Sequence, residues 1–230
     1  MKKRIAAFIV TIISTVVLAG CGDSTTRVTD VVDNSEKSTT EEAAESTETE
    51  SATQTVSDGT DMELLTGKHH VEIEVANYGT IKVELDADAA PISTTNFIEL
   101  ARDGFYDGLT FHRIISGFMI QGGDPTGTGM GGSDRMIKGE FSDNGVQNDL
   151  SHTRGAISMA RSADMDSASS QFFIVHEDSD FLDGQYAVFG YVTEGMEYVD
   201  KICQDTKVED NNGTVSAENQ PVITRVTVMD

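Results

Sequence analysis

The stretch FHRIISGFMIQGGD, Phe111–Asp124, holds two short runs of β-forming residues that are separated by Gly117. Runs of this kind, bounded by glycine, are typical of strands joined by a turn. Arg113 and Gln121 lie among apolar residues and glycines, and the stretch has no thiol and no cluster of acids or bases. This raises the question of which chemistry needs a cation and an amide in an apolar setting and no more reactive group.

The segments on either side predict further short strands and two helices. Residues 71–75 and 81–85 alternate apolar and polar side chains around NYG, which predicts a β-hairpin. Residues 91–103 begin with a proline and end before Gly104, which is typical of a helix. We expect further strands in GAISMAR, SQFFIVH, YAVFGYVT and VITRVTVMD, and a second helix in MEYVDKICQ. Many short strands with two helices favour a closed or nearly closed antiparallel barrel.

The N-terminal residues have the pattern of an export signal. MKKR is basic, and the apolar run that follows is too short and ends too abruptly for a membrane span. The ending LAGC resembles the lipobox of bacterial lipoproteins, which predicts a signal peptide at residues 1–20 and a lipidated Cys21. The alternative is an ordinary secreted protein with a chance cysteine. The lipobox reading predicts an extracytoplasmic protein that is lipid-anchored to the cell membrane.

Residues 21–66 have the composition of a disordered tether. They are rich in Ser, Thr and Glu and contain no aromatic residue, so they cannot bury enough apolar surface to offset the cost of ordering. Twelve acidic and two basic residues lie between Gly22 and Glu63, and their mutual repulsion should extend the chain. The simplest interpretation is a solvated spacer, and the alternative is an acidic segment that binds a partner.

Residues 67–230 are long enough for one domain with a sizeable core. The chain has a net charge of -23 and this domain has no basic stripe, which argues against nucleic-acid binding. Its single cysteine, Cys203, cannot form an intramolecular disulfide, and its place in a helix-like run predicts a core position.

Two features that suggest a ligand site do not have the context that such a site needs. GTGMGG, Gly127–Gly132, has the spacing of a dinucleotide-binding loop, but no strand precedes it and no helix follows it. His69 and His70 are neighbours in a predicted strand, so their side chains point to opposite faces. The other three histidines lack the spacing of metal ligands. We therefore expect neither a metal nor a cofactor.

Several motifs, in order and in register, resemble those of the cyclophilins, the peptidyl-prolyl cis-trans isomerases. The matching stretches are NFIELARDGFYDGLTFHRIISGFMIQGGD, GTGMGG, GAISMAR, SQFFIVH, FLDGQYAVFG and EGM, and the resemblance covers residues 71–230. It implies a mainly β fold, an eight-stranded closed antiparallel barrel capped by two helices, with a proline-binding groove on one outer face. It also implies an enzyme that isomerises X-Pro bonds, here in exported proteins at the membrane surface.

The resemblance assigns roles to individual positions. The catalytic arginine falls on Arg113, and the glutamine that holds the substrate backbone falls on Gln121. The proline pocket falls on Phe118, Met119, Phe173 and Leu182, and the backbone-contacting segment falls on Met159, Ala160 and Arg161. Further groove positions fall on Gly129, Ser162 and Gln171, and the pocket rim falls on Phe181 and Tyr186.

Three positions depart from the family's usual residues. Phe181 stands where a tryptophan is frequent, Tyr186 where a histidine is frequent, and Arg161 where an asparagine is usual. We expect proline-containing polypeptides as substrates, a monomer, weak cyclosporin binding and an altered substrate preference. The alternatives are a chaperone or scaffold that binds proline loops without essential catalysis, and a surface-interaction lipoprotein. Arg113 favours the enzyme, because binding alone would not need it.

Overall fold

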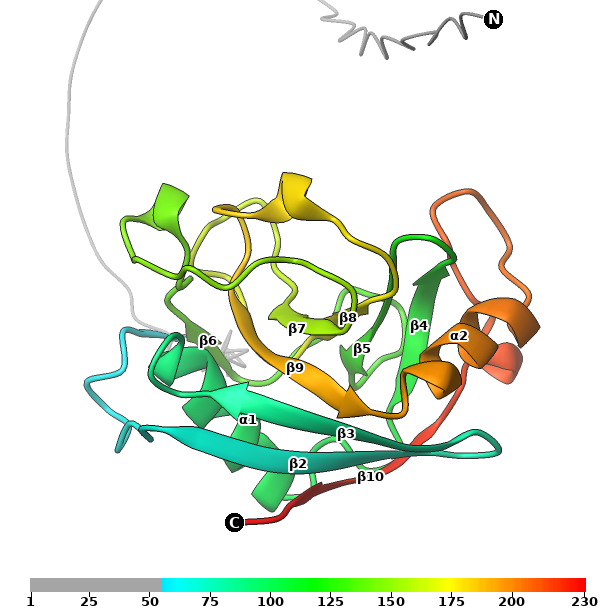
Figure 1. Ribbon diagram of the computed structural model, residues 1–230, viewed down its shortest axis with the longest axis horizontal. Coiled ribbons are helices and arrows are strands. Elements are labelled where there is room, and N and C mark those ends of the chain that lie inside the picture. The colour runs from blue at the N-terminus through cyan, green and yellow to red at the C-terminus, as the bar shows by residue number, and fades with distance from the viewer. Residues whose placement is uncertain (1–54) are drawn as a thin grey trace, which may run out of the picture. The chain divides into compact units, whose positions relative to one another are not determined.

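The computed structural model describes residues 55–230 (Figure 1). This part of the chain contains ten short strands and two α-helices, one helix after the third strand and one near the C-terminus. The elements are β1 Thr55–Ser57, β2 Lys68–Val75, β3 Gly79–Asp86, α1 Pro91–Arg102, β4 Thr110–Ile115, β5 Met119–Asp124, β6 Arg135–Ile137, β7 Ala156–Met159, β8 Phe172–Val175, β9 Val188–Glu194, α2 Met196–Asp205 and β10 Ile223–Val228. Single 3-10 turns lie at Ser142–Asn144, Asp180–Leu182 and Ala217–Asn219.

Eight of these strands form one antiparallel sheet in the order β10-β2-β3-β9-β7-β8-β5-β4. The predicted hairpin is confirmed as β2 and β3, in which Val71 pairs with Val83 and Ile73 with Ile81. These four side chains are buried because they share the inner face of the pleat, while the intervening polar residues face outward.

The sheet is open, so the predicted closed barrel is wrong. β4 and β10 are its edge strands, and no ladder joins them. The segment that leads into β10 instead runs along β4, where the amide of Phe111 donates to the carbonyl of Pro221 at 2.9 Å and that of Ile114 to Gly213 at 2.8 Å. A continuous strand cannot form here, because Pro221 has no N–H and Gly213 has a left-handed φ of 82°.

The core lies between the curled sheet and the two helices. Phe97 of α1 stacks on Tyr106 with ring centroids 4.8 Å apart and meets Phe172 of β8 edge-on at 5.4 Å. In α2, Val199, Ile202 and Cys203 are buried. The predicted core position of Cys203 is confirmed, and burial raises the pKa of its thiol to about 12.

The folded part begins before residue 67. β1 pairs in parallel with β6, and the amide of Leu65 donates to Oγ1 of Thr95 at 2.9 Å. Leu65 also packs on the main core. Residues 55–66, which the sequence analysis placed in the tether, therefore contact the domain. The predicted signal peptide, Cys21 and the rest of the tether lie outside the described residues.

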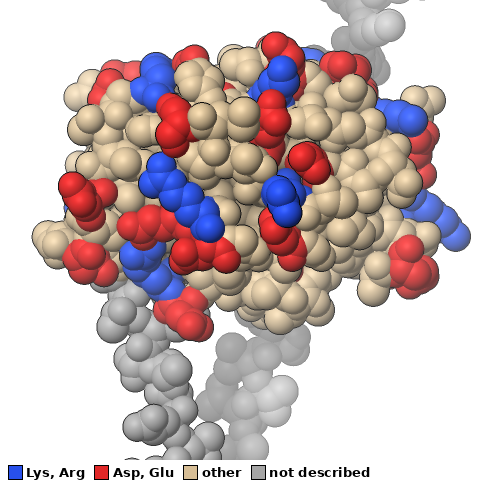
Figure 2. All heavy atoms as spheres, turned by 90° about the horizontal axis from the view of Figure 1, so that it is seen from below, with Lys and Arg blue, Asp and Glu red and all other residues tan. Residues whose placement is uncertain are grey.

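The surface carries both signs of charge. On the face seen in Figure 2, Lys and Arg side chains are interspersed with Asp and Glu side chains. Ion pairs of this kind join neighbouring strands, as between Lys68 of β2 and Asp86 of β3 at 2.6 Å and between Lys82 of β3 and Glu194 of β9 at 2.8 Å. No helix within residues 55–230 has both the length and the apolarity to span a membrane.

Candidate active site

The structure brings most of the predicted site residues around one pocket of about 220 Å³, called here the proline pocket. Strands β4, β5 and β8, the turn before β5, the segment that follows β7 and the segment of residues 182–186 contribute to it. The lining residues are Arg113, Phe118, Met119, Gln121, Ala160, Arg161, Phe173, Leu182 and Tyr186.

A second hollow of about 380 Å³, called here the side groove, adjoins the proline pocket and shares Gln121, Ala160 and Arg161 with it. The predicted residues Gly129, Ser162 and Gln171 line the side groove and not the proline pocket. Phe181 lines neither hollow. Its side chain is exposed, and its ring lies 5.6 Å from that of Phe118, beside the proline pocket.

Strand register places the polar side chains next to one another. Arg113 of β4 pairs with Gln121 of β5, which pairs on its other side with Phe173 of β8. Directly paired residues in an antiparallel sheet put their side chains on the same face, about 5 Å apart. Glycine is needed beside this site, because a Cβ on Gly122 would lie 2.7 Å from the carbonyl oxygen of Thr110.

The guanidinium of Arg113 is held in a fixed orientation. Its Nε donates to the carbonyl oxygen of Asn212 at 2.9 Å, its Nη2 to Oδ1 of Asn212 at 3.3 Å and its Nη1 to Oε1 of Gln121 at 3.2 Å. Burial lowers the pKa of Arg113, with Tyr186 and Asp210 opposing, but an arginine stays charged in proteins. The stretch DNNG around Asn212 indicates only a turn, so Asn212 was not among the predicted site residues.

The amide of Gln121 connects Arg113 to the glycine-rich loop. Nε2 of Gln121 donates to Oε1 of Gln171 at 2.9 Å, and Nε2 of Gln171 donates to the carbonyl oxygen of Gly131 at 2.7 Å. A chain of hydrogen bonds therefore runs from the proline pocket along the side groove. It fixes which way both amide groups point, and so which atoms face a substrate.

The glycine-rich loop is folded around a carboxylate of the protein itself. The buried side chain of Asp124 accepts hydrogen bonds from the amides of Thr126 at 2.7 Å and Gly129 at 2.6 Å. Burial disfavours the ionised form of Asp124, yet these hydrogen bonds hold its pKa below the usual value. The loop amides that would hold a phosphate already bind Asp124, which supplies the physical reason to reject a dinucleotide site.

A buried polar chain lies behind the floor of the proline pocket. The ring of His152 stacks on Phe173 at 5.9 Å, and its Nδ1 and Nε2 lie 2.8 Å from Oδ1 of Asp183 and 3.0 Å from Oγ of Ser158. Burial lowers the pKa of His152, although Asp183 opposes this. Ser158 is inaccessible, so this Ser–His–Asp arrangement supports the pocket wall and is not a nucleophilic centre. No spacing in the sequence connects these three residues.

The chain is similar to known proteins over most of the described residues. The family described as "Cyclophilin type peptidyl-prolyl cis-trans isomerase/CLD" matches residues 70–228. The chain belongs to this family. A peptidyl-prolyl cis-trans isomerase of Helicobacter pylori is 47% identical over 135 residues, which cover 58% of this chain and 80% of that protein. Peptidyl-prolyl cis-trans isomerase B of Bacillus subtilis is 52% identical over 118 residues, covering 51% of this chain and 79% of that protein.

Solved cyclophilin structures have the same fold. A Cryptosporidium parvum cyclophilin is 30% identical with a TM-score of 0.63, and the match covers 71% of this chain and 99% of that one. The same protein in the presence of the dipeptide Ala-Pro is 32% identical with a TM-score of 0.62, covering 70% and 99%. The present cyclophilin is thus a peptidyl-prolyl cis-trans isomerase with an open, curled antiparallel sheet and two helices.

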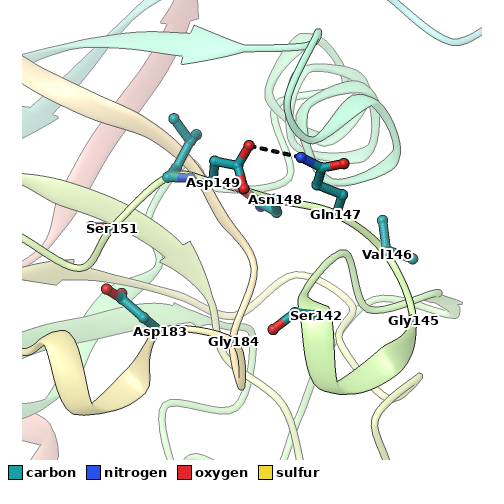
Figure 3. Close-up of a pocket in the computed structure, with 10 residues that line it drawn as sticks. Ser142, Gly145, Val146, Gln147, Asn148, Asp149, Ser151, Asp183 and Gly184 are labelled. Atoms are coloured by element: carbon teal, nitrogen blue, oxygen red, sulfur yellow. Dashed lines mark hydrogen bonds between the residues drawn. The ribbon is translucent and has the colours of Figure 1, made fainter.

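A larger hollow of about 580 Å³ in this cyclophilin lies apart from the proline pocket (Figure 3). It is lined by Ser142, residues 145–151, Asp183 and Gly184, and it shares no lining residue with the proline pocket. Figure 3 shows Gln147 and Asp149 joined by a hydrogen bond of 2.9 Å. Its lining includes two carboxylates and no cation, so it lacks a donor like Arg113. Within residues 55–230, no three His, Cys, Asp or Glu side chains are placed to hold a metal ion.

Proposed function

We propose that Arg113 and Gln121 are the catalytic side chains of this isomerase and that the proline ring of the substrate occupies the proline pocket. The observation that carries this proposal is a guanidinium fixed by Asn212 and Gln121 at the wall of a small pocket whose floor is apolar. Met119, Phe173 and Leu182 are buried and form that floor, which suits the apolar ring of proline.

The chemistry needs no nucleophile, because isomerisation only twists an amide. Resonance holds the X-Pro bond planar, with a barrier of about 18–20 kcal/mol. In the twisted transition state the prolyl nitrogen regains its lone pair and becomes a good hydrogen-bond acceptor. A fixed charged donor therefore binds the transition state better than either ground state, as catalysis requires. Arg113 supplies such a donor in a fixed position.

The magnitudes show that Arg113 alone is not sufficient. A rate of about 10³ per second corresponds to a barrier near 13 kcal/mol, so roughly 6 kcal/mol must be removed. One charge-assisted hydrogen bond contributes about 1.5–3 kcal/mol. The remainder has to come from the apolar pocket, which excludes water that favours the charge-separated planar amide. Gln121 and the backbone at Ala160 contribute further by holding one side of the bond while the other turns.

The test is a protease-coupled assay with a proline peptide and the purified chain. We expect catalytic amounts of the protein to accelerate cis-to-trans conversion well above the uncatalysed rate. Peptide binding without acceleration would contradict these roles and would instead support a proline-binding chaperone or scaffold.

The cellular setting is a further part of the proposal. We propose that the mature protein is anchored to the membrane through lipidated Cys21, acts as a monomer and isomerises prolyl bonds of exported proteins at the extracytoplasmic surface. The support is the signal-like N-terminus, the ending LAGC and the acidic Ser/Thr/Glu-rich stretch that follows. Acyl chains contribute about 0.8 kcal/mol per buried CH2, so a diacylated cysteine would hold the protein at the membrane.

Weak cyclosporin binding is the last part of the proposal. Phe181 stands beside Phe118 with 63% of its surface exposed, where a cyclic peptide would meet it. Phenylalanine keeps an aromatic wall but has no N–H group to donate, unlike tryptophan. A ligand that uses such a donor loses one hydrogen bond here, whereas a substrate held by its proline ring and backbone loses little.

A further inference from the structure

Arg161 places a second cation at the boundary of the proline pocket and the side groove, and its side chain lines both. Its Nε and Nη2 donate to the carbonyl oxygen of Gln185 at 3.1 and 2.9 Å, and its Nη1 donates to that of Ser162 at 2.9 Å. The ring of Tyr186 lies 4.6 Å from the guanidinium carbon, in a cation–π arrangement. The charge is therefore held in place.

The guanidinium of Arg161 keeps donors for a ligand. A guanidinium carries five N–H groups, and the hydrogen bonds to Gln185 and Ser162 use three of them. Both acceptors are neutral carbonyl oxygens, so they do not neutralise the positive charge. The hydrogen-bond acceptors of Arg113, on Asn212 and Gln121, are also neutral, but Arg113 is the proposed partner of the prolyl nitrogen. Arg161 is therefore the cation that remains for another group of the ligand.

The two hollows that Arg161 borders have no acidic lining residue, although the chain has a net charge of -23. Neither the proline pocket nor the side groove is lined by Asp or Glu. Three other hollows each have an acidic lining residue: Asp149 and Asp183 line the one in Figure 3, Asp210 lines one beside α2, and Glu177, Asp178 and Asp200 line another together with Arg154.

Ion pairing shows the same contrast. Within residues 55–230, no carboxylate lies within 4.0 Å of Arg113 or Arg161, whereas Arg135, Arg154 and Arg225 each have one. A fixed and unneutralised cation in an acid-free groove is complementary to an anionic group of a ligand.

We propose that Arg161 is a specificity-determining residue that binds a carboxylate side chain of the substrate, from an Asp or Glu within two residues of the proline. This inference rests on the proposed function, which puts the proline ring in the pocket that Arg161 borders. The side groove, at about 380 Å³, provides space for such a side chain. Exposed ion pairs are weak and charge-assisted hydrogen bonds are stronger, so a partly exposed contact predicts a preference of about three- to tenfold in kcat/KM.

The experiment measures kcat/KM of the full chain by exchange NMR on matched peptide pairs. The two peptides of a pair differ only by Glu or Gln at one of the two positions before or after the proline. The native protein is compared with R161Q, which loses the charge, and with R161K, which keeps the charge without the planar fork. R225Q is the matched control: it removes the same charge from β10, where the side chain of Arg225 is 66% exposed and 3.9 Å from Asp107.

We expect a Glu-to-Gln ratio of about three to ten at one position in the native protein, a ratio near one in R161Q, an intermediate ratio in R161K and the native ratio in R225Q. If Arg161 has a purely structural role, R161Q lowers kcat/KM for both peptides equally and keeps the native Glu-to-Gln ratio. That result would overturn the inference. So would a native ratio near one at all four positions, or an equal loss in R225Q.

Two further readouts keep the outcomes distinct. If R161Q does not fold, the native ratio is measured between about 0.05 and 0.5 M salt, where screening should reduce it, and a constant ratio overturns the inference. If the native protein accelerates no peptide, the proposed function fails. If it accelerates peptides without a preference for Glu, only the role of Arg161 fails.

Discussion

Arg113 combines two requirements at the scale of a single residue: it carries a permanent charge, and it is held still. Asn212 and Gln121 accept three of its hydrogen bonds, so its remaining N–H groups have a defined direction. Lysine would keep the charge but not the planar fork that two neighbours hold at once. Catalysis by one oriented donor therefore depends on the side chain's geometry as much as on its charge.

The first prediction concerns this residue. Arg113→Ala should lower kcat/KM about ten- to hundredfold, which corresponds to the loss of one charge-assisted hydrogen bond in the transition state. Arg113→Lys should also lower kcat/KM at least tenfold. The control is Arg102→Ala, which removes an exposed arginine at the end of α1. The peptide assay and a thermal melt are measured together, and native activity in a folded Arg113→Ala protein would refute the mechanism.

The second prediction concerns Phe181. Phe181→Trp adds an N–H donor at an exposed position beside Phe118, so cyclosporin should inhibit the variant about ten- to thirtyfold more strongly, the effect of about 1.4–2 kcal/mol. The value of kcat/KM should change little. Drug titrations of both proteins in the same assay decide the matter. If cyclosporin inhibits the native protein strongly, or inhibits Phe181→Trp no more strongly than the native protein, another residue determines cyclosporin binding.

At the scale of elements, α1 depends on a residue that is distant in the sequence. Its N-cap residue, Ala90, makes no side-chain cap. Glu140 takes that role from the loop after β6: its carboxylate accepts the amides of Ile92 at 2.9 Å and Ser93 at 2.8 Å. The sequence shows a helix start at Pro91 but gives no sign of this cap, because Glu140 lies 48 residues from Ile92.

The third prediction tests this cap. Glu140→Ala leaves buried amides at the start of α1 without acceptors and should reduce the free energy of unfolding by about 2–4 kcal/mol. Asp134→Ala, an exposed change of equal charge nearby, should have little effect. Chemical denaturation of the three proteins gives the comparison. An equal stability of Glu140→Ala and the native protein would contradict the assignment.

The carboxyl group of Glu140 also makes the free energy of unfolding depend on pH. Burial raises the pKa of Glu140 above its usual 4.5, although bonds from Ser93 and the backbone oppose this. A raised pKa in the folded state means that the contribution of Glu140 to stability is fully present below pH 4.5 and decreases as the pH rises through the folded value. The difference in stability between the native protein and Glu140→Ala should therefore be larger at pH 4 than at pH 7.

At the scale of the whole molecule, the proposed membrane setting depends on Cys21, which lies outside the described residues. The fourth prediction is that Cys21→Ser moves the protein from the membrane fraction to a soluble or uncleaved form and abolishes labelling by a fatty-acid analogue. Cys203 is an internal control, because it remains in the variant, is buried and should stay unlabelled. Unchanged labelling and fractionation would show that Cys21 is not the anchor.

The sequence by itself determined the local elements and the family. The β2–β3 hairpin, both helices, the strands that carry Arg113 and Gln121 and the core position of Cys203 follow from periodicity, proline and glycine placement and burial preference, which are local properties. The site residues could be named because their motifs stand in a fixed order along the chain.

Only the tertiary structure decided how these parts meet. It left the sheet open where Pro221 and Gly213 border β4, added residues 55–66 to the domain, and brought Asn212 to Arg113. It also placed His152 behind Phe173 and left Arg161 without a neighbouring carboxylate. Each of these features depends on contacts between segments that lie far apart in the chain. The packing of the whole domain sets those contacts, and no periodic pattern in the sequence predicts them.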